Sequence, residues 1–416
     1  MSRNPLYKER PVEPNPATYG SQRINDFIVL SEAFSNCYLI ETPEGNIQIN
    51  TGMGMEAPVV KANFDAHSTA PLKYVIFTQG HVDHLGGTAF LREQNPGVQV
   101  IAQANNTEHQ AYDTRLAKFR GERSAFAFVD KFAQAFADYA AHDYTQFPAQ
   151  DAPTPDVLFE TTHSLELGGL QVELIAVPGA ETNDSLIVWL PQHKICFTGN
   201  LFGCPFGHFP NLVTIRGDRY RDALTVAAAV DTVRALGAET ILYGHHGPVE
   251  GKELIATELT ALHDAILHVH DAVVEGMNAG KALSTLMAEI SLPPEMEVGQ
   301  GYGKVSWSVR AIWENYAGWF KHLSTTELYH QPASAVHRDL VELAGGAGPL
   351  VARAQQKLDS QQPVEAIHLL DIVLGVEPEH TGAKQACIAA HQALLDESVN
   401  FWLSSWLKQQ IKLLQA

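Results

Sequence analysis

Short runs of apolar residues alternate with turn residues in the first part of the chain. Between residues 25 and 55 these runs are rich in β-branched and aromatic residues, and TPEGN lies between two of them as a hairpin-type turn. Residues 73–78 are almost continuously apolar, which is typical of a strand buried on both faces. A helix is predicted after Gly86 and Gly87, and VQVIAQ predicts the next strand. This order of elements indicates an α/β region.

Helical spacing replaces the strand pattern in two places. Residues 107–150 carry phenylalanines three to four residues apart and indicate an inserted helical segment, after which strands return at 157–176, 185–190 and 194–198. Residues 219–236 predict a helix, ETILY predicts a strand, and long helices dominate from about residue 252. We expect three parts: an extended arm over 1–22, an α/β domain over 23–255 with its insert at about 107–150, and an all-helical domain over 256–416.

Composition narrows the range of functions. The 416 residues carry a net charge of −19, which argues against nucleic acid or anionic lipid as a general partner, because both need a basic surface. The four cysteines form no CxxC pair and make a poor disulfide framework. The N-terminus lacks an apolar signal region, and no apolar run is long enough to span a membrane. We therefore expect a cytoplasmic protein with no membrane span.

Candidate metal ligands follow the apolar run 73–78. The stretch QGHVDHLGG places His81, Asp83 and His84 in one turn, and Gln79 stands two residues before His81. Imidazole and carboxylate groups are the donors that zinc takes in proteins. Glu181, in a Pro-Gly turn after another predicted strand, is a further oxygen donor. The pattern predicts a metal site, although a solvated loop and a surface glutamate are the simpler interpretations.

Three later loops carry the remaining candidate residues. Asn200, after the strand KICFT, is a weak ligand that can hydrogen-bond a water or a substrate. The stretch NLVTIRG provides Asn211, Thr214 and Arg216, and a planar guanidinium suits a sulfate, phosphate or carboxylate. His245 and His246 lie between glycines after the last predicted strand.

Together, SNCYLIET, INTG, FTQGHVDHLGG, VPGAE, FTGN and GHHGP resemble, in this order, the metallo-β-lactamase superfamily. Two further stretches resemble the alkylsulfatases of this superfamily. One is PNLVTIRGDRYRDA, and the other is GYGKVSWSVRAIWENYAGWF, which resembles their dimerisation domain. The resemblance implies an αββα sandwich with a binuclear zinc site, followed by an all-α helical dimerisation domain. It ends at Ala416, so we expect the sterol-carrier-like domain of secreted alkylsulfatases to be absent.

The resemblance also implies ligand positions. The first metal would be held by the residues at 79 and 81 together with Glu181, and the second by Asp83, His84 and His246. His246 is preferred to His245 because it directly precedes Gly-Pro. The chain departs from the family at Gln79 and at Asn200, where a histidine and a bridging glutamate are expected. A carboxamide is a feeble substitute for either on zinc. The expected cofactor is therefore one or two zinc ions, with iron or manganese possible.

The function that follows is hydrolysis of an anionic ester with an apolar tail, most simply an alkyl sulfate. Arg216, with Asn211 and Thr214, would orient the anionic head; Asp83 would orient the attacking water, and His245 or His208 would donate a proton. The insert's phenylalanines would line a tail pocket or form a helical core. Two alternatives stay open. One is hydrolysis of a thioester, lactone or phosphoester, and the other is an inactive binding protein; a homodimer is expected either way.

Overall fold

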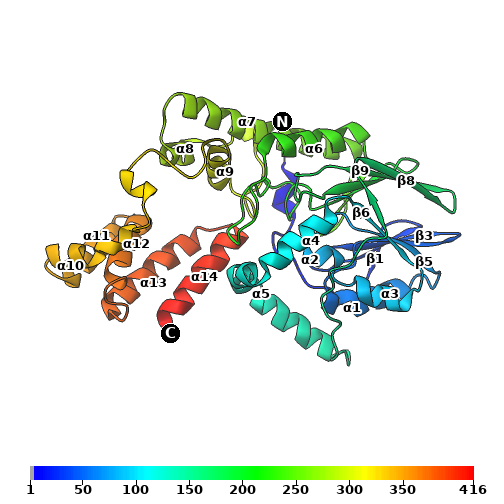
Figure 1. The fold of residues 1–416 in the computed structure, drawn as a ribbon, viewed down its shortest axis with the longest axis horizontal. Helices are drawn as coiled ribbons and strands as arrows, with labels where there is room; N and C mark the ends of the chain where they lie inside the picture. Colours follow the sequence, from blue (N-terminus) through cyan, green and yellow to red (C-terminus); the bar gives the residue numbers. More distant parts are fainter. Residues whose placement is uncertain (1–3) are drawn as a thin grey trace. The chain divides into compact units, whose positions relative to one another are not determined.

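The structure, a computed structural model, describes residues 4–416 and contains two β-sheets packed face to face (Figure 1). The strands of the first sheet lie in chain order, antiparallel from β1 to β4 and parallel from β4 to β7. They are β1 (Gln22–Arg23), β2 (Ile28–Ser31), β3 (Cys37–Thr42), β4 (Gly45–Ile49), β5 (Leu72–Ile76), β6 (Gln99–Gln103) and β7 (Val157–Phe159).

The second sheet has the order β13-β12-β11-β10-β9-β8, and within it only the pair β11 and β12 is parallel. Its strands are β8 (Thr162–Leu167), β9 (Leu170–Ala176), β10 (Leu186–Leu190), β11 (Ile195–Gly199), β12 (Thr240–Tyr243) and β13 (Val249–Glu250). Alternate side chains of both sheets fill the space between them; Leu186 and Val188 of β10 point inward with Ile28 and Leu30 of β2.

Helices cover both outer faces. The first sheet packs against α1 (Ala57–Asp65), α2 (Val82–Leu85), α3 (Thr88–Gln94) and part of the insert, and the second against α6 (Ala223–Leu236), α7 (Lys252–Asn278) and α9 (Val305–Ala317). The side chains of β10 that point away from the inner core, Ile187 and Trp189, meet this second helical layer. Because both faces of each sheet are covered, the strands are apolar on both sides. The predicted αββα sandwich is confirmed.

The insert forms two helices, α4 (Asn106–Arg115) and α5 (Ala117–Ala140), and residues 144–156 contain no regular element. Its phenylalanines do not share one environment. Phe128 and Phe132 lie with ring centroids 6.2 and 5.1 Å from that of Phe34, whereas Phe119 is 54% exposed beneath the guanidinium of Arg123. The middle of the aromatic stripe therefore serves packing.

The described part of the arm is held against the first compact unit. It contains a short 3-10 turn at Leu6–Glu9, the backbone N–H of Leu6 donates to Glu258, and Ala17 is buried. This unit ends at Tyr316 and includes α7, α8 (Leu283–Glu289) and α9, because α7 and α9 bury an apolar face on the second sheet. The compact units thus divide at 316/317, later in the chain than the predicted boundary at 255/256.

The second unit, Ala317–Ala416, is helical. It consists of α10 (His337–Leu343), α11 (Ala347–Asp359), α12 (Pro363–Leu374), α13 (Thr381–Asp396) and α14 (Phe401–Gln415). Small residues such as Ala354, Ala366 and Ala383 form much of its core and let the helices approach closely. The predicted all-α region after the sandwich is confirmed. No helix within residues 4–416 has both the length and the apolar content that crossing a bilayer requires.

Candidate active site

The loops that follow β5, β11 and β12 meet at one edge of the sandwich. Gln79, after β5, accepts a hydrogen bond at Oε1 from the backbone N–H of Asn200, after β11, at 3.4 Å. The backbone N–H of Gly244, after β12, donates to the carbonyl of Gly199 at 2.9 Å. Its own carbonyl accepts from Asn36 in the β2–β3 loop at 2.6 Å. Residues far apart in the sequence are thereby brought to one place.

The first group of predicted ligands, Gln79, His81 and Glu181, is already engaged by protein. A hydrogen bond of 2.8 Å joins the Gln79 amide to Nδ1 of His81, and Nε2 of His81 lies 3.3 Å from a guanidinium nitrogen of Arg216. Glu181 accepts from Arg221 at 2.9 Å. Each of these donor atoms could bind a metal ion only after its present hydrogen bond or ion pair is broken.

Asp218 sits at the centre of this network. Its Oδ2 lies 3.8 Å from Nε2 of His81, 2.8 Å from Arg120, 3.6 Å from Arg216 and 3.9 Å from Arg221. Burial alone would raise the pKa of Asp218, but His81 and the guanidinium groups hold it well below its usual range. Asp218 is therefore a carboxylate at neutral pH.

Burial sets the protonation of the two neighbouring groups. It lowers the pKa of His81 well below the ordinary value, and Arg216 lowers it further, so the ring is neutral. Burial raises the pKa of Glu181 to about 7, against the opposing effect of Arg221. The first group is thus one neutral imidazole, one neutral carboxamide and one carboxyl group held by an arginine.

The second group differs because it keeps unused donor atoms. His84 is fully buried; Ser35 and Thr78 both lie 3.1 Å from its Nδ1, while its Nε2 has no hydrogen-bond partner within residues 4–416. The nearest carboxylate oxygen to that Nε2 is Oδ2 of Asp83, at 3.8 Å. A buried nitrogen without a partner is costly unless another group completes it.

The two adjacent histidines face different neighbours. Burial lowers the pKa of His245 well below its ordinary value, and His246 and His84 lower it further. Burial also lowers the pKa of His246, to about 4, with a smaller contribution from Arg10. Nδ1 of His245 and Nε2 of His246 both lack hydrogen-bond partners in the described chain. The choice of His246 as ligand therefore stays a prediction, with His245 as its alternative.

The turn that carries these histidines is strained and tightly held. His246 has φ = +62°, a left-handed conformation that is unusual for a side chain other than glycine. Asn36 donates to the His246 carbonyl at 2.7 Å, and Arg10 donates to the carbonyls of Gly247 and Pro248 at 2.6 and 3.3 Å. These bonds hold the turn in a conformation that the residue itself disfavours.

The other predicted site residues each have different neighbours. The Asn211 carbonyl accepts from Arg221, and Oγ1 of buried Thr214 has no partner in the described structure. His208 lies outside the His81 network: its Nδ1 accepts from the backbone N–H of Gly301 at 2.9 Å, and its pKa is lowered to about 4, first by burial and then by His246. Asn200 points its side-chain oxygen, which has no described partner, toward Gly244.

A pocket of about 410 Å³ opens beside both groups. His81, Asp83 and Arg216 contribute to its wall. The insert supplies small residues one helical turn apart, namely Thr114, Ala117, Gly121 and Ser124. None of the insert's phenylalanines lines it. The pocket thus combines a charged end with a narrow wall of small side chains.

The fit to metal ions differs between the groups. No three His, Cys, Asp or Glu side chains in the described part of the chain converge on one metal position. The first group does not fit an ion, since protein partners occupy its donors. The second group has the donor types for a single ion, because Asp83, His84 and either His245 or His246 are the kinds of ligand that a catalytic zinc takes, but their side chains do not converge on one position in the described structure.

Residues 30–245 match the model of the metallo-beta-lactamase superfamily. The chain belongs to this superfamily. Residues 284–414 match the alkyl sulfatase dimerisation family, so the metallo-beta-lactamase domain is followed by an alkylsulfatase-type helical domain, as predicted. The family and the fold are those that the loop motifs in the sequence predict.

Curated relatives carry alkylsulfatase names. A linear primary-alkylsulfatase of Pseudomonas sp. (strain ATCC 19151) is 29% identical over 334 residues, which are 76% of this chain and 62% of the relative. The alkyl/aryl-sulfatase BDS1 of Saccharomyces cerevisiae is 24% identical, over 96% of this chain and 64% of its own length. The chain thus spans less than two thirds of these relatives.

A solved structure supports the fold over nearly the whole chain. The stereoselective inverting sec-alkylsulfatase Pisa1 from Pseudomonas sp. superposes with a TM-score of 0.83 at 22% identity, covering 95% of this chain and 66% of that one. At this identity the likeness establishes the metallo-beta-lactamase fold with its helical extension.

Sequence reasoning missed the groups that hold the site together. Asp218 and Arg221 lie in the charge-rich stretch RGDRYRD, and this density of alternating charge in a loop was the available signal. Arg10 lies in a segment with no motif. Asn36 lies in SNCYLIET, one of the stretches that carry the family resemblance, but nothing in the sequence shows that it contacts the turn of His246.

Proposed function

We propose that the chain is a metal-dependent hydrolase of anionic esters, with alkyl sulfates as the most probable substrate class and a single divalent ion at the second group. The observation that carries the proposal is His84, a fully buried histidine whose Nε2 has no described partner and lies 3.8 Å from Asp83. Membership of the metallo-beta-lactamase superfamily and the alkylsulfatase names of the relatives support it.

The chain's own residues divide the work. Asp83 and His84, with His245 or His246, would hold a zinc ion, and a bound zinc supplies a Lewis acid and lowers the pKa of a water. Ser35 and Thr78 orient the His84 ring through its Nδ1. Arg216, on the wall of the pocket, binds the anionic head, and the small residues of the insert leave room for an unbranched apolar tail.

His245 and His208 are the candidate proton donors. Nδ1 of His208 accepts from the backbone N–H of Gly301, whereas Nδ1 of His245 has no hydrogen-bond partner in the described structure. If His246 is the ligand, then His245 is placed to pass a proton to the leaving oxygen. If His245 is the ligand, the donor has to come from another group or from solvent. Paired His245→Ala and His246→Ala variants decide, because only loss of the ligand removes the metal.

A homodimer is part of the proposal. The helical domain matches a family described by dimerisation, and its surface exposes large apolar side chains, among them Leu323 at 73%, Leu343 at 84% and Val399 at 79%. An apolar side chain exposed in the single chain can be buried when two copies associate. Sedimentation velocity is expected to give a dimer mass, and a monomer at all concentrations contradicts this part.

The experiment is a substrate panel of alkyl sulfates, thioesters, lactones and phosphoesters with the zinc-loaded protein. Asp83→Asn is expected to lower kcat/KM by about 100-fold or more, since it removes a ligand and a charge. Asp151→Asn is the matched control, because Asp151 lines the same pocket outside the second group. Equal loss in both variants, or turnover that survives Asp83→Asn, refutes the proposal.

A second candidate is an inactive dimeric binding protein, which the protein-occupied first group favours. It predicts no turnover of any ester by the wild type after loading with zinc, manganese or iron. It also predicts that Asp83→Asn leaves the dimer intact.

A further inference from the structure

The first group of predicted ligands is completed by charges of the chain itself. Nε2 of His81 faces Arg216 at 3.3 Å, and Glu181 faces Arg221 at 2.9 Å. We propose that the guanidinium groups of Arg216 and Arg221 take the place of a metal ion here, so that this half of the site binds no divalent cation. The inference deepens the proposed function and rests on it only in confining the catalytic ion to the second group.

Arg221 cannot withdraw at small cost. It is 6% exposed, and its donors are spent on the carboxylate of Glu181, on the Glu181 carbonyl at 2.6 Å and on the carbonyl of Asn211. Moving Arg221 away from this position would remove the donor from the carboxylate of Glu181 and from the carbonyl oxygens of Glu181 and Asn211. Each such loss is destabilising, and an uncompensated buried charge most of all.

Arg216 is held through its backbone. Arg123 on α5 donates to the carbonyls of Ile215 and Arg216, at 2.7 and 3.0 Å. Arg120, one helical turn earlier, pairs with Asp218 at 2.8 Å. The insert therefore fixes the loop from its outer side and keeps the Arg216 side chain at His81.

Electrostatics oppose a divalent ion at the same place. Three guanidinium groups, those of Arg120, Arg216 and Arg221, lie within 4 Å of Oδ2 of Asp218. Asp218, and Asp113 beside Arg120, offset part of this positive charge. A divalent cation at His81 would still meet the guanidinium of Arg216 at short range, and neutral Gln79 adds no negative charge there.

Arg216 also contributes to the pocket. Its side chain lines the wall beside Asp83, while its Nε is buried without a hydrogen-bond partner in the described structure. The class of group that suits a guanidinium on this wall is an oxyanion such as sulfate, phosphate or carboxylate. The anionic head of a substrate would thus meet a guanidinium where a second metal would otherwise bind it.

The test is metal content per chain after zinc loading and desalting, compared across substitutions. Wild type and Gln79→His are both expected to hold about one zinc or less, because restoring a histidine does not remove the arginine. Gln79→His combined with Arg216→Ala is expected to gain about one further zinc. Arg216→Gln in the same background removes the charge but keeps a polar side chain, and should show the same gain if the alanine variant fails to fold.

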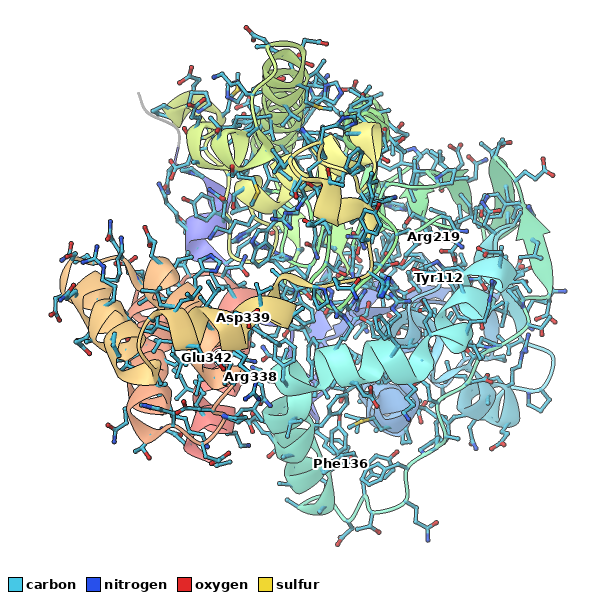
Figure 2. The ribbon with its side chains drawn as sticks, turned by 60° about the vertical axis from the view of Figure 1, so that its left-hand side comes forward. Tyr112, Phe136, Arg219, Arg338, Asp339 and Glu342 are labelled. Atoms are coloured by element: carbon cyan, nitrogen blue, oxygen red, sulfur yellow. The ribbon has the colours of Figure 1, made fainter. Side chains whose placement is uncertain are left out.

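The matched control is Arg219→Ala with Gln79→His. Arg219 is on the same loop but outside the network: its guanidinium lies 4.3 Å from the Tyr112 ring centroid and 2.9 Å from Glu108 (Figure 2). This control is expected to show no gain in zinc. Two zinc ions in Gln79→His alone overturn the proposal, as does the absence of any gain in both Arg216 variants.

Failure of this inference can be distinguished from failure of the hydrolase proposal. Metal content is measured without substrate, so a wild type with one zinc and no ester turnover supports the arginine network and refutes the enzyme. A wild type with two zinc ions and full turnover refutes the arginine network and the single-ion site but supports ester hydrolysis.

Discussion

Glu56 is a buried carboxyl group on which three separate segments converge. Its Oε1 accepts from the backbone N–H of Ala17 at 2.8 Å and of Phe34 at 2.9 Å, and its Oε2 accepts from Met53 at 2.9 Å. The same loop continues from Phe34 to Ser35, which lies 3.1 Å from Nδ1 of His84. Glu56 therefore ties the arm and the β2–β3 loop to the candidate site.

We predict that Glu56→Gln changes how stability depends on pH. Burial raises the pKa of Glu56 from 4.5 to about 7, although the three N–H groups lower it in part. The contribution of this group to stability is full below pH 4.5 and is lost as pH rises through about 7, because the folded state binds the proton more tightly. At about 1.36 kcal/mol per pH unit, the difference amounts to roughly 3 kcal/mol.

Glutamine cannot titrate, so the variant lacks this dependence. It also carries a cost of about 1–3 kcal/mol at every pH, since one side of the amide turns an N–H group toward a backbone N–H. Urea unfolding at pH 5 to 8 measures both effects. The wild-type free energy of unfolding minus that of Glu56→Gln is expected to fall by roughly 2–3 kcal/mol across this range.

The control is Glu41→Gln, a partly exposed carboxylate paired with Arg23 at 2.8 Å. Its effect is expected to stay below about 1 kcal/mol, as for other surface ion pairs. A difference curve for Glu56→Gln that is flat between pH 5 and 8, or that rises with pH, refutes the reasoning about burial.

Two further predictions concern the site. Arg10→Ala removes the bonds to the carbonyls of Gly247 and Pro248 and should weaken zinc binding by about 10–100-fold. Arg23→Ala, which changes an exposed arginine of β1 that pairs with Glu41, should not weaken it; equal zinc affinities of the two variants in a competition titration contradict this. Gly121→Leu should raise KM for long-chain alkyl sulfates by about 10-fold and leave KM for short-chain esters unchanged. A Cβ at Gly121 meets no atom within 4 Å, so the larger side chain can enter the pocket. The same change in KM for both chain lengths contradicts this prediction.

The sequence by itself determined the layers and the loops. Alternation in runs such as SLIVWL places Ile187 and Trp189 on one face and Val188 on the other, whatever surrounds them. Ligand-type residues after strands predict a site at a sheet edge, because the ends of neighbouring strands lie together. Gln79 is a departure from the family pattern that the sequence alone shows.

Only the tertiary structure decided which partners these residues have. A sequence shows that Arg216 and Arg221 exist but not that they reach His81 and Glu181, since pairing depends on where a loop folds back. The strain of the His246 turn also appears only in the structure, because its backbone angle of +62° is maintained by hydrogen bonds from Asn36 and Arg10, which are distant in the sequence. Likewise, helical spacing predicted α7, whereas packing against the second sheet placed it in the first unit.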